Sequence, residues 1–283
     1  MRPQQAPQEW RTAAGIEYRK AGLRDMKEKA QSKSLFFMSA AVVILLAIFP
    51  TIHAQTKDAE ALRQRVLRAS HSSRINDVEM KPWHLKIQFK LYEANGKQRE
   101  AGTLEEWWGG QTLWAKKIES PSYTATVIEN RDGNFRTQGA EPIPLEIRAI
   151  EESIVYPMPM GEDLSRTIPQ LSHVNLAKVP LDCIQLGEPQ RPVSSAKFCL
   201  DSDSVLRTIY SSNSSSVLRS KIKGFQGHSV AHLVTVKIGS LTKAEAEVSE
   251  LTEIKLVDDL FTPSTDMKKA ADIHTLKKNV PIR

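Results

Sequence analysis

Residues 83–91 constrain the fold most, because apolar and polar side chains alternate there at every position. The apolar members are Trp83, Leu85, Ile87, Phe89 and Leu91. Successive side chains of a β-strand point to opposite faces of a sheet, so this alternation predicts a strand with one buried face. The stretch Glu93-Ala-Asn-Gly96 follows directly and predicts a hairpin turn. We therefore expect the chain to be built on an antiparallel sheet.

Short runs with strand character continue along the chain and are interrupted by one helical stretch. The predicted strands are Gly102–Trp108, Leu113–Glu119, Tyr123–Glu129, Asn134–Thr137, His173–Val179, Cys183–Leu186, Lys197–Leu200, Val205–Ser211, Val217–Phe225, His228–Ile238 and Ala244–Ile254. Gln226-Gly227 predicts a turn that pairs its two flanking strands. Residues 55–72 and 142–156 have helical periodicity instead. The expected fold class is α+β and mostly β, with a large antiparallel sheet and two or three helices.

An uncharged apolar run from Leu35 to Ile52 predicts entry into or passage across a membrane. Lysines precede it and a small residue, Ala54, follows it, which is the order found in signal peptides. Cleavage after Ala54 is one interpretation, and a retained single-span anchor with its N-terminus in the cytoplasm is the other. The leader before Leu35 is long for a signal peptide, so translation from Met1 and from Met26 both stay open.

These features divide the chain into four segments. We expect a basic leader (residues 1–34), the signal peptide or membrane span (35–54), the folded domain (55–263) and a loose basic tail (264–283). The folded domain is expected to work outside the cytoplasm, either in the periplasm or facing it from the inner membrane.

The basic character of the chain belongs mainly to its leader. The formal net charge is +6, and residues 1–54 contain eight Lys or Arg against four Asp or Glu. Subtracting these from the 39 basic and 33 acidic residues of the chain leaves 31 and 29, a net of +2 over residues 55–283. Nucleic-acid binding requires a cationic surface. Nucleic acid is therefore not expected among the partners.

Cys183 and Cys199 are the only cysteines. Each lies in a short extended stretch, and the residues between these stretches are rich in turn formers, so we expect neighbouring strands with the two sulfurs in register. An oxidising compartment then favours a disulfide. Two thiols are too few for a structural zinc site, and their spacing is not that of a Cys-x-x-Cys redox motif.

No arrangement of residues predicts catalysis, a metal site or a cofactor. The chain lacks a Gly-x-Ser-x-Gly elbow, a phosphate-binding glycine loop and a His-Glu-x-x-His motif. Glu105 and Glu106 are adjacent in a predicted strand, so they point to opposite faces and cannot act on one bond; we expect one solvated Glu. His228 and His232 could share a face, but two ordinary sheet histidines explain them as well as a metal site does.

Large aromatic side chains gather in residues 83–123, where the sequence contains Trp83, Phe89, Trp107, Trp114 and Tyr123. A curved sheet must cover such a face with a helix, with a bound apolar ligand, or with both. A closed core and an apolar ligand cavity are the two interpretations, since ligand pockets are concave and mainly apolar.

Four stretches resemble parts of bacterial outer-membrane lipoprotein carriers, the LolA/LolB-like lipoprotein-sorting superfamily. They are Gly102-Thr-Leu-Glu-Glu-Trp-Trp108, Leu113-Trp-Ala-Lys-Lys-Ile-Glu-Ser-Pro121, Thr126-Val-Ile-Glu-Asn-Arg-Asp-Gly133 and Glu253-Ile-Lys-Leu-Val-Asp-Asp-Leu-Phe-Thr-Pro263. The sequence departs from the carrier pattern at three places. Gly109-Gly-Gln-Thr112 replaces a basic-Pro pair, Asn134-Phe-Arg136 replaces a Trp-aromatic-Asp run, and the cysteines lie in an insertion-like region.

The resemblance implies an unclosed antiparallel half-barrel whose concave side is covered by helices and holds acyl chains. It predicts an exported envelope protein, not an enzyme, that binds a lipid or a lipoprotein acyl chain. The expected cavity lining is Trp83, Leu85, Ile87, Phe89, Trp107 and Trp114. The alternative is a membrane-anchored structural or sensory domain in the periplasm that acts through protein contacts, because fold does not fix function.

Overall fold

The computed structural model describes residues 58–137, 142–159, 164, 167–187, 196–211 and 214–269. All of them belong to one compact unit, Pro50–Arg283. The apolar run from Leu35 to Ile52, the cleavage position after Ala54 and the two candidate start residues lie outside the described residues, so these stay predictions. Within the ranges given above, no helix combines the length and the apolar character needed to cross a membrane.

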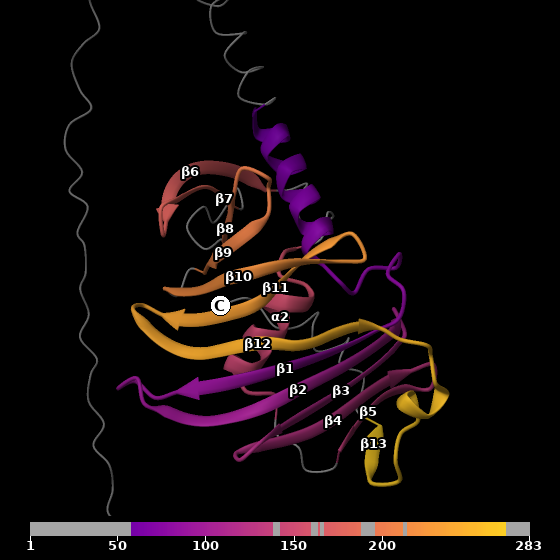
Figure 1. The fold of residues 1–283 in the computed structure, drawn as a ribbon. Coiled ribbons are helices and arrows are strands. Elements are labelled where there is room, and N and C mark those ends of the chain that lie inside the picture. Colours follow the sequence, from indigo (N-terminus) through magenta and orange to yellow (C-terminus); the bar gives the residue numbers. More distant parts are fainter. Residues whose placement is uncertain are drawn as a thin grey trace, which may run out of the picture. The chain divides into compact units, whose positions relative to one another are not determined.

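The described residues form one antiparallel sheet (Figure 1). Its strands are β1 (Trp83–Tyr92), β2 (Gln98–Gly110), β3 (Leu113–Ser120), β4 (Tyr123–Asn130), β5 (Gly133–Thr137), β6 (Ile168–Leu176), β7 (Val179–Gly187), β8 (Lys197–Leu200), β9 (Leu206–Tyr210), β10 (Ser215–Phe225), β11 (His228–Ile238), β12 (Leu241–Glu253) and β13 (Met267–Lys269). They run in the order β13-β5-β4-β3-β2-β1-β12-β11-β10-β9-β8-β7-β6. The sheet is not closed, because β13 and β6 lie at its opposite edges, which agrees with the expected fold class.

The centre of the sheet joins the two halves of the sequence. Strand β1 pairs with β2 on one side and with β12 on the other, where Trp83 lies opposite Glu253. The hairpin of β10 and β11 turns at Gln226 and Gly227, as the sequence predicted. One turn was missed. The predicted strand His173–Val179 covers the end of β6, a turn and the first residue of β7. The strand is broken because Ala177 and Lys178 both have positive φ, an uncommon conformation for these residue types.

Within the described ranges, two helices of more than ten residues cover the sheet. Residues 58–73 form the first, and α2 (Leu145–Val155) is the second. Helix α2 contacts β11 and β12 and contributes Ile147, Ile150 and Ile154 to the main apolar core. The helix of residues 58–73 contributes Val66 and Ala69 to a second core with β7 and β8. Both helices were expected from their periodicity.

The last described residues return to the other edge of the sheet. A short 3-10 helix, η1 (Asp258–Phe261), buries Phe261. Strand β13 then pairs with β5, where Met267 lies opposite Thr137. The expected loose tail, residues 264–283, is described only as far as Lys269, and this part already contains β13.

Candidate functional site

We call the sheet face that carries Trp83 and contacts α2 the inner face. Of the predicted lining residues, the four on β1 are buried there, with exposed fractions of at most 2 %. They are Trp83, Leu85, Ile87 and Phe89. Trp114 of β3 packs against the same core and is partly buried. The structure therefore brings five of the six predicted residues to one face.

Trp107 lies on the opposite face, and Trp108 takes the inner position that Trp107 was expected to occupy. Trp108 pairs across the sheet with Trp83, and their rings stack with centroids 6.1 Å apart. Trp107 instead stacks on His84 at 5.0 Å and packs near Phe261. Because neighbouring strand residues point to opposite faces, only one of the two tryptophans could face inward, and the sequence did not show which one.

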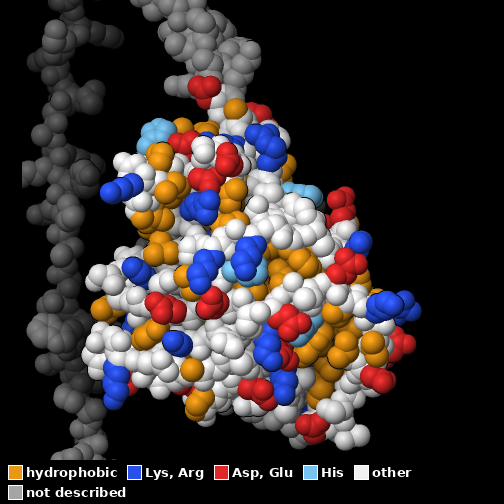
Figure 2. Space-filling view, in the orientation of Figure 1, with side chains coloured by type: hydrophobic (Ala, Val, Ile, Leu, Met, Phe, Trp, Pro, Cys, Tyr) orange, Lys and Arg blue, Asp and Glu red, His pale blue; other side chains and the backbone are white. Residues whose placement is uncertain are grey.

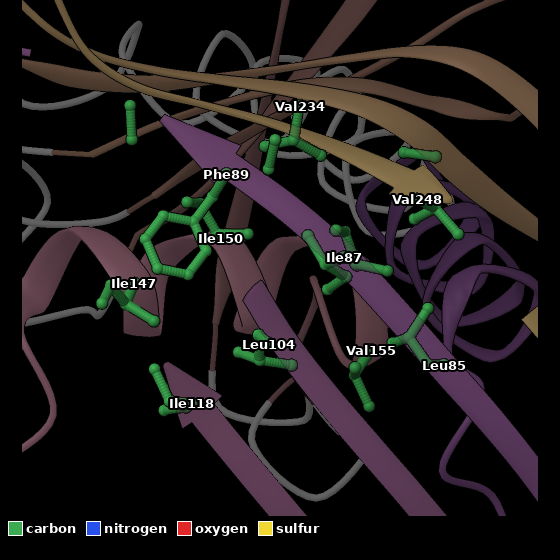
Figure 3. Packing of buried hydrophobic residues seen from close by; sticks show 14 of the residues in the cluster. Leu85, Ile87, Phe89, Leu104, Ile118, Ile147, Ile150, Val155, Val234 and Val248 are labelled. Atoms are coloured by element: carbon green, nitrogen blue, oxygen red, sulfur yellow. The ribbon is translucent and has the colours of Figure 1, made fainter. Parts of the chain in front are cut away.

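Side chains from α2 fill the space over the central strands. Ile147 and Ile150 of α2 lie beside Phe89, while Leu104 and Ile118 come from β2 and β3 (Figure 3). All of these except Phe89 have an exposed fraction of 0 %. The apolar inner face is thus covered by a helix of the chain itself in this state.

Three charged side chains are buried between the inner face and α2. Glu106 and Lys116 are cross-strand neighbours on β2 and β3, and Glu151 comes from α2. Their exposed fractions are 5 %, 6 % and 3 %. Lys116 Nζ donates a hydrogen bond to Glu151 Oε1, whereas Glu106 Oε2 is buried without a hydrogen-bond partner among the described residues. We call these three residues the buried triad.

The buried triad contains two acids and one base, so one carboxyl has no counter-charge. Burial, together with repulsion from Glu151, raises the pKa of Glu106 to about 8, and the attraction of Lys116 only partly offsets this. Burial opposes the charge on Lys116, but the two nearby carboxylates raise its pKa overall. At neutral pH the triad therefore holds a Lys116–Glu151 ion pair and a neutral Glu106. A neutral carboxyl can donate one hydrogen bond and accept others.

Arg219 of β10 is a second buried charge. Its exposed fraction is 2 %, and Nη1 donates a hydrogen bond to the Leu206 carbonyl at 3.1 Å. Its Nε and Nη2 atoms have no partner among the described residues. Burial lowers the pKa of Arg219 to about 9, and repulsion from Arg207 adds to this. The guanidinium therefore stays charged at neutral pH.

Arg207, whose charge acts on Arg219, and other charged residues of this half of the sheet are engaged in ion pairs. Arg207 Nε donates to Asp201 Oδ2 at 2.7 Å. Arg65, from the helix of residues 58–73, donates to Asp182 Oδ2 at 2.5 Å. His173 lies 2.7 Å from the other oxygen of Asp182. A surface hollow of about 240 Å³ adjoins Asp182 and Asp201. The carboxylates of Asp182 and Asp201 are thus already engaged by other cations.

Cys183 and Cys199 form the predicted disulfide. They are opposite each other on β7 and β8 and fully buried, with Leu181 packed beside them. The sequence argument from two neighbouring strands is confirmed. The bridge ties together the strands that carry the second apolar core.

Sequence reasoning missed the buried charges. It treated Glu105 and Glu106 as a strand pair with one solvated Glu, and Glu105 does point outward, 2.5 Å from Lys86. No signal in the sequence marked Glu106, Lys116 and Glu151 as a cluster, because 35 residues separate the last two. The alternation of side chains along β3 indicates only that Lys116 and Trp114 lie on the same face of the sheet.

Metal ligands do not gather within the described ranges, where no group of three or more His, Cys, Asp or Glu could hold an ion. His228 Nδ1 donates a hydrogen bond to the His71 carbonyl, 2.9 Å away. On the face shown in Figure 2, acidic and basic side chains are interspersed. The charged side chains that are unusual in their position are therefore the buried ones described above, the buried triad and Arg219.

The arrangement is that of an unclosed antiparallel sheet whose inner face is covered by helices. Comparison with solved structures finds similarity to a LolA superfamily protein from Nitrosomonas europaea, with a TM-score of 0.47 at 11 % identity, over 71 % of this chain and 97 % of that one. An outer-membrane lipoprotein-sorting protein domain from Vibrio parahaemolyticus gives 0.46 at 9 %, over 70 % and 97 %. A DUF1329 family protein from Desulfovibrio piger gives 0.47 at 10 %, over 72 % and 97 %.

The proteins from Nitrosomonas europaea and Vibrio parahaemolyticus are of the lipoprotein-sorting kind that the four sequence stretches resemble. No family model and no curated protein matches the sequence.

Proposed function

We propose that this is an exported envelope protein that binds an apolar ligand, a lipid or a lipoprotein acyl chain, between the inner face and α2. Its working compartment in this proposal is the periplasm, reached through the apolar run from Leu35 to Ile52. The protein acts by sheltering its ligand from water and catalyses no reaction. The ligand would contact Trp83, Leu85, Ile87, Phe89 and Trp114 together with Trp108.

The observation that supports the proposal is how the inner face is covered. The face is a continuous apolar surface contributed by several strands, and α2, an 11-residue helix, lies over its centre. Apolar contacts and the Lys116–Glu151 pair hold α2 there, and α2 has no place in the hydrogen-bonded strand order. Displacing α2 therefore exposes the apolar surface while the sheet stays intact. A bound acyl chain would replace the contacts that α2 makes, at roughly 25 cal/mol for each Å² of apolar surface kept from water.

The buried triad adds a polar group to the part of this surface that α2 covers. Neutral Glu106 presents an oxygen without a partner among the described residues, next to the apolar contacts of β1 and β2. Ester and amide carbonyls of acylated molecules accept hydrogen bonds from a protonated carboxyl. The site thus suits a chain that carries a carbonyl near its end better than a pure hydrocarbon.

Tryptophan fluorescence tests the proposal directly. Bromine quenches a tryptophan only at short range, so the methyl ester of dibromostearate, which is uncharged, should quench the purified full-length protein in a saturable way. Replacing Trp108 with Phe should remove a large part of this quenching. Replacing Trp107 with Phe is the matched control, because Trp107 lies on the opposite face, and it should leave the quenching by the bound ester almost unchanged.

Two results would contradict the proposal. Absence of saturable quenching would show that the inner face does not admit an acyl chain and would favour the alternative, a structural or sensory domain that acts through protein contacts. Quenching that depends on Trp107 and not on Trp108 would place the ligand on the opposite face. Lipid found by native mass spectrometry on protein purified from its own envelope would support the proposal independently.

A further inference from the structure

Arg219 occupies the inner face at the border of the two apolar cores. It is opposite Val234 of β11, Val234 is opposite Ala246 of β12, and Ala246 is opposite Phe89 of β1. Directly opposed residues of neighbouring strands share a face. These four side chains therefore form a row across the inner face, from the guanidinium to the centre of the main core.

The row is uncovered by the same movement that opens the inner face. Helix α2 contacts β11 and β12, the strands that carry the two middle members, Val234 and Ala246. Neighbouring strands are about 4.8 Å apart, so the row from Arg219 to Phe89 is about 14 Å long. That is a length that an extended acyl chain covers easily, and both middle side chains are small.

The charge on Arg219 has no counter-charge among the described residues. Asp201 is engaged by Arg207, and Asp182 by Arg65 and His173. The buried triad resolves its own imbalance because Glu106 takes up a proton. An arginine does not lose its proton near neutral pH, so only an anion can balance it. Leaving a cation buried and unpaired is costly for the folded protein.

We infer that Arg219 is the headgroup site for an anionic amphiphile, with the headgroup on the guanidinium and the chain along the row to Phe89. This inference rests on the proposed function, and it adds the chemical class of the ligand. The planar guanidinium presents Nε and Nη2 side by side, which matches two oxygens of a carboxylate or of a phosphate. A long-chain carboxylate and an anionic phospholipid share this chemistry.

The experiment compares ligands with one chain and different heads on the full-length protein. The probes are stearate, its methyl ester and stearoyl lysophosphatidylglycerol, and isothermal titration calorimetry measures the affinity of each. Calorimetry is used because the row to Phe89 lies six positions along β1 from Trp83, outside the short range of bromine quenching. The variants are Arg219→Met and, as a matched control, Arg131→Met, which changes an exposed arginine in the turn between β4 and β5. Circular dichroism and thermal unfolding confirm that each variant folds, and Arg219→Gln replaces Arg219→Met if the latter does not.

We expect at least one anionic probe to bind the wild-type protein about tenfold or more tightly than the ester, the range for a charge-assisted hydrogen bond. Arg219→Met should abolish this preference and leave the affinity for the ester within about threefold, whereas Arg131→Met should keep the preference. The better anionic probe tells whether a carboxylate or a phosphate is the natural head.

The two proposals fail differently. An ester that does not bind the wild-type protein refutes the proposed function and this inference with it. An ester that binds as tightly as both anions, or a preference for anions that persists in the neutral Arg219 variant, refutes the inference alone.

Discussion

Replacing Glu106 with glutamine tests the electrostatics of the inner face. The folded-state pKa of Glu106 is raised from 4.5 to about 8 by burial and by Glu151. A carboxyl with a raised folded-state pKa contributes its full stability below its unfolded pKa and loses it as the pH rises towards the folded value. The free energy of unfolding should therefore fall by about 1.4 kcal/mol for each pH unit in this window. Between pH 5 and pH 8 the loss amounts to about 4 kcal/mol.

Glutamine has the shape of the protonated acid and cannot ionise. At pH 5 the Glu106→Gln variant should match the wild-type protein within about 1 kcal/mol, and at pH 8 it should be the more stable by about 4 kcal/mol. Urea unfolding at several pH values measures this difference, and taking the difference cancels groups that titrate in both proteins. One such group is His232, whose pKa is lowered, mainly by burial.

Glu105→Gln is the matched control, because it changes the neighbouring residue on the opposite face. It removes a partly exposed ion pair with Lys86 and should cost under about 1 kcal/mol. A difference between wild type and Glu106→Gln that stays constant from pH 5 to pH 9 would refute the reasoning. It would mean that water reaches Glu106 or that the buried triad does not form.

Three further changes probe the fold. Lys116→Met leaves Glu151 buried without its partner and should cost about 3–5 kcal/mol in urea unfolding at pH 7; a cost below 1 kcal/mol would contradict the burial of the pair. Gly102→Ala places a Cβ 2.4 Å from the Glu119 carbonyl and should destabilise by about 1–3 kcal/mol, whereas Gly224→Ala, with open space around it, should not; equal effects would refute this close approach. The Cys183→Ala, Cys199→Ala variant lacks the disulfide and should be less stable by about 3 kcal/mol, because the disulfide closes a loop of 16 residues. Two free thiols in the denatured, unreduced wild-type protein would exclude the disulfide.

The strands were readable from the sequence because local patterns specify them. Alternation in β1, the Gln226-Gly227 turn and the helical period of residues 145–155 each depend on neighbours in the chain. The break between β6 and β7 was not readable, because Ala177 and Lys178 are poor signals for the positive φ that they adopt. The three residues of β13 were missed as well, since so short a strand has no period of its own.

The candidate site was readable only in its apolar part. Burial of Trp83 and Phe89 follows from alternation, but the choice between Trp107 and Trp108 depends on the register of β2 against β1. Charged residues are expected at the surface, so a sequence gives no reason to place Lys116 or Arg219 inside. Their positions follow from contacts between distant segments, which alternation and periodicity do not encode.

The pairing of β1 with β12 has a consequence for how the chain acquires its structure. The pairing at the middle of the sheet cannot form until Glu253, 170 positions after Trp83, has been synthesised. Folds dominated by such distant contacts form slowly, because closing a long loop costs entropy before the new contacts stabilise the chain. A ribosome or translocon that has released only the first two thirds of this polypeptide holds hairpins without a finished interior. Because the central pairing forms late, the chain stays sufficiently unfolded to pass through a translocon until its last strands emerge.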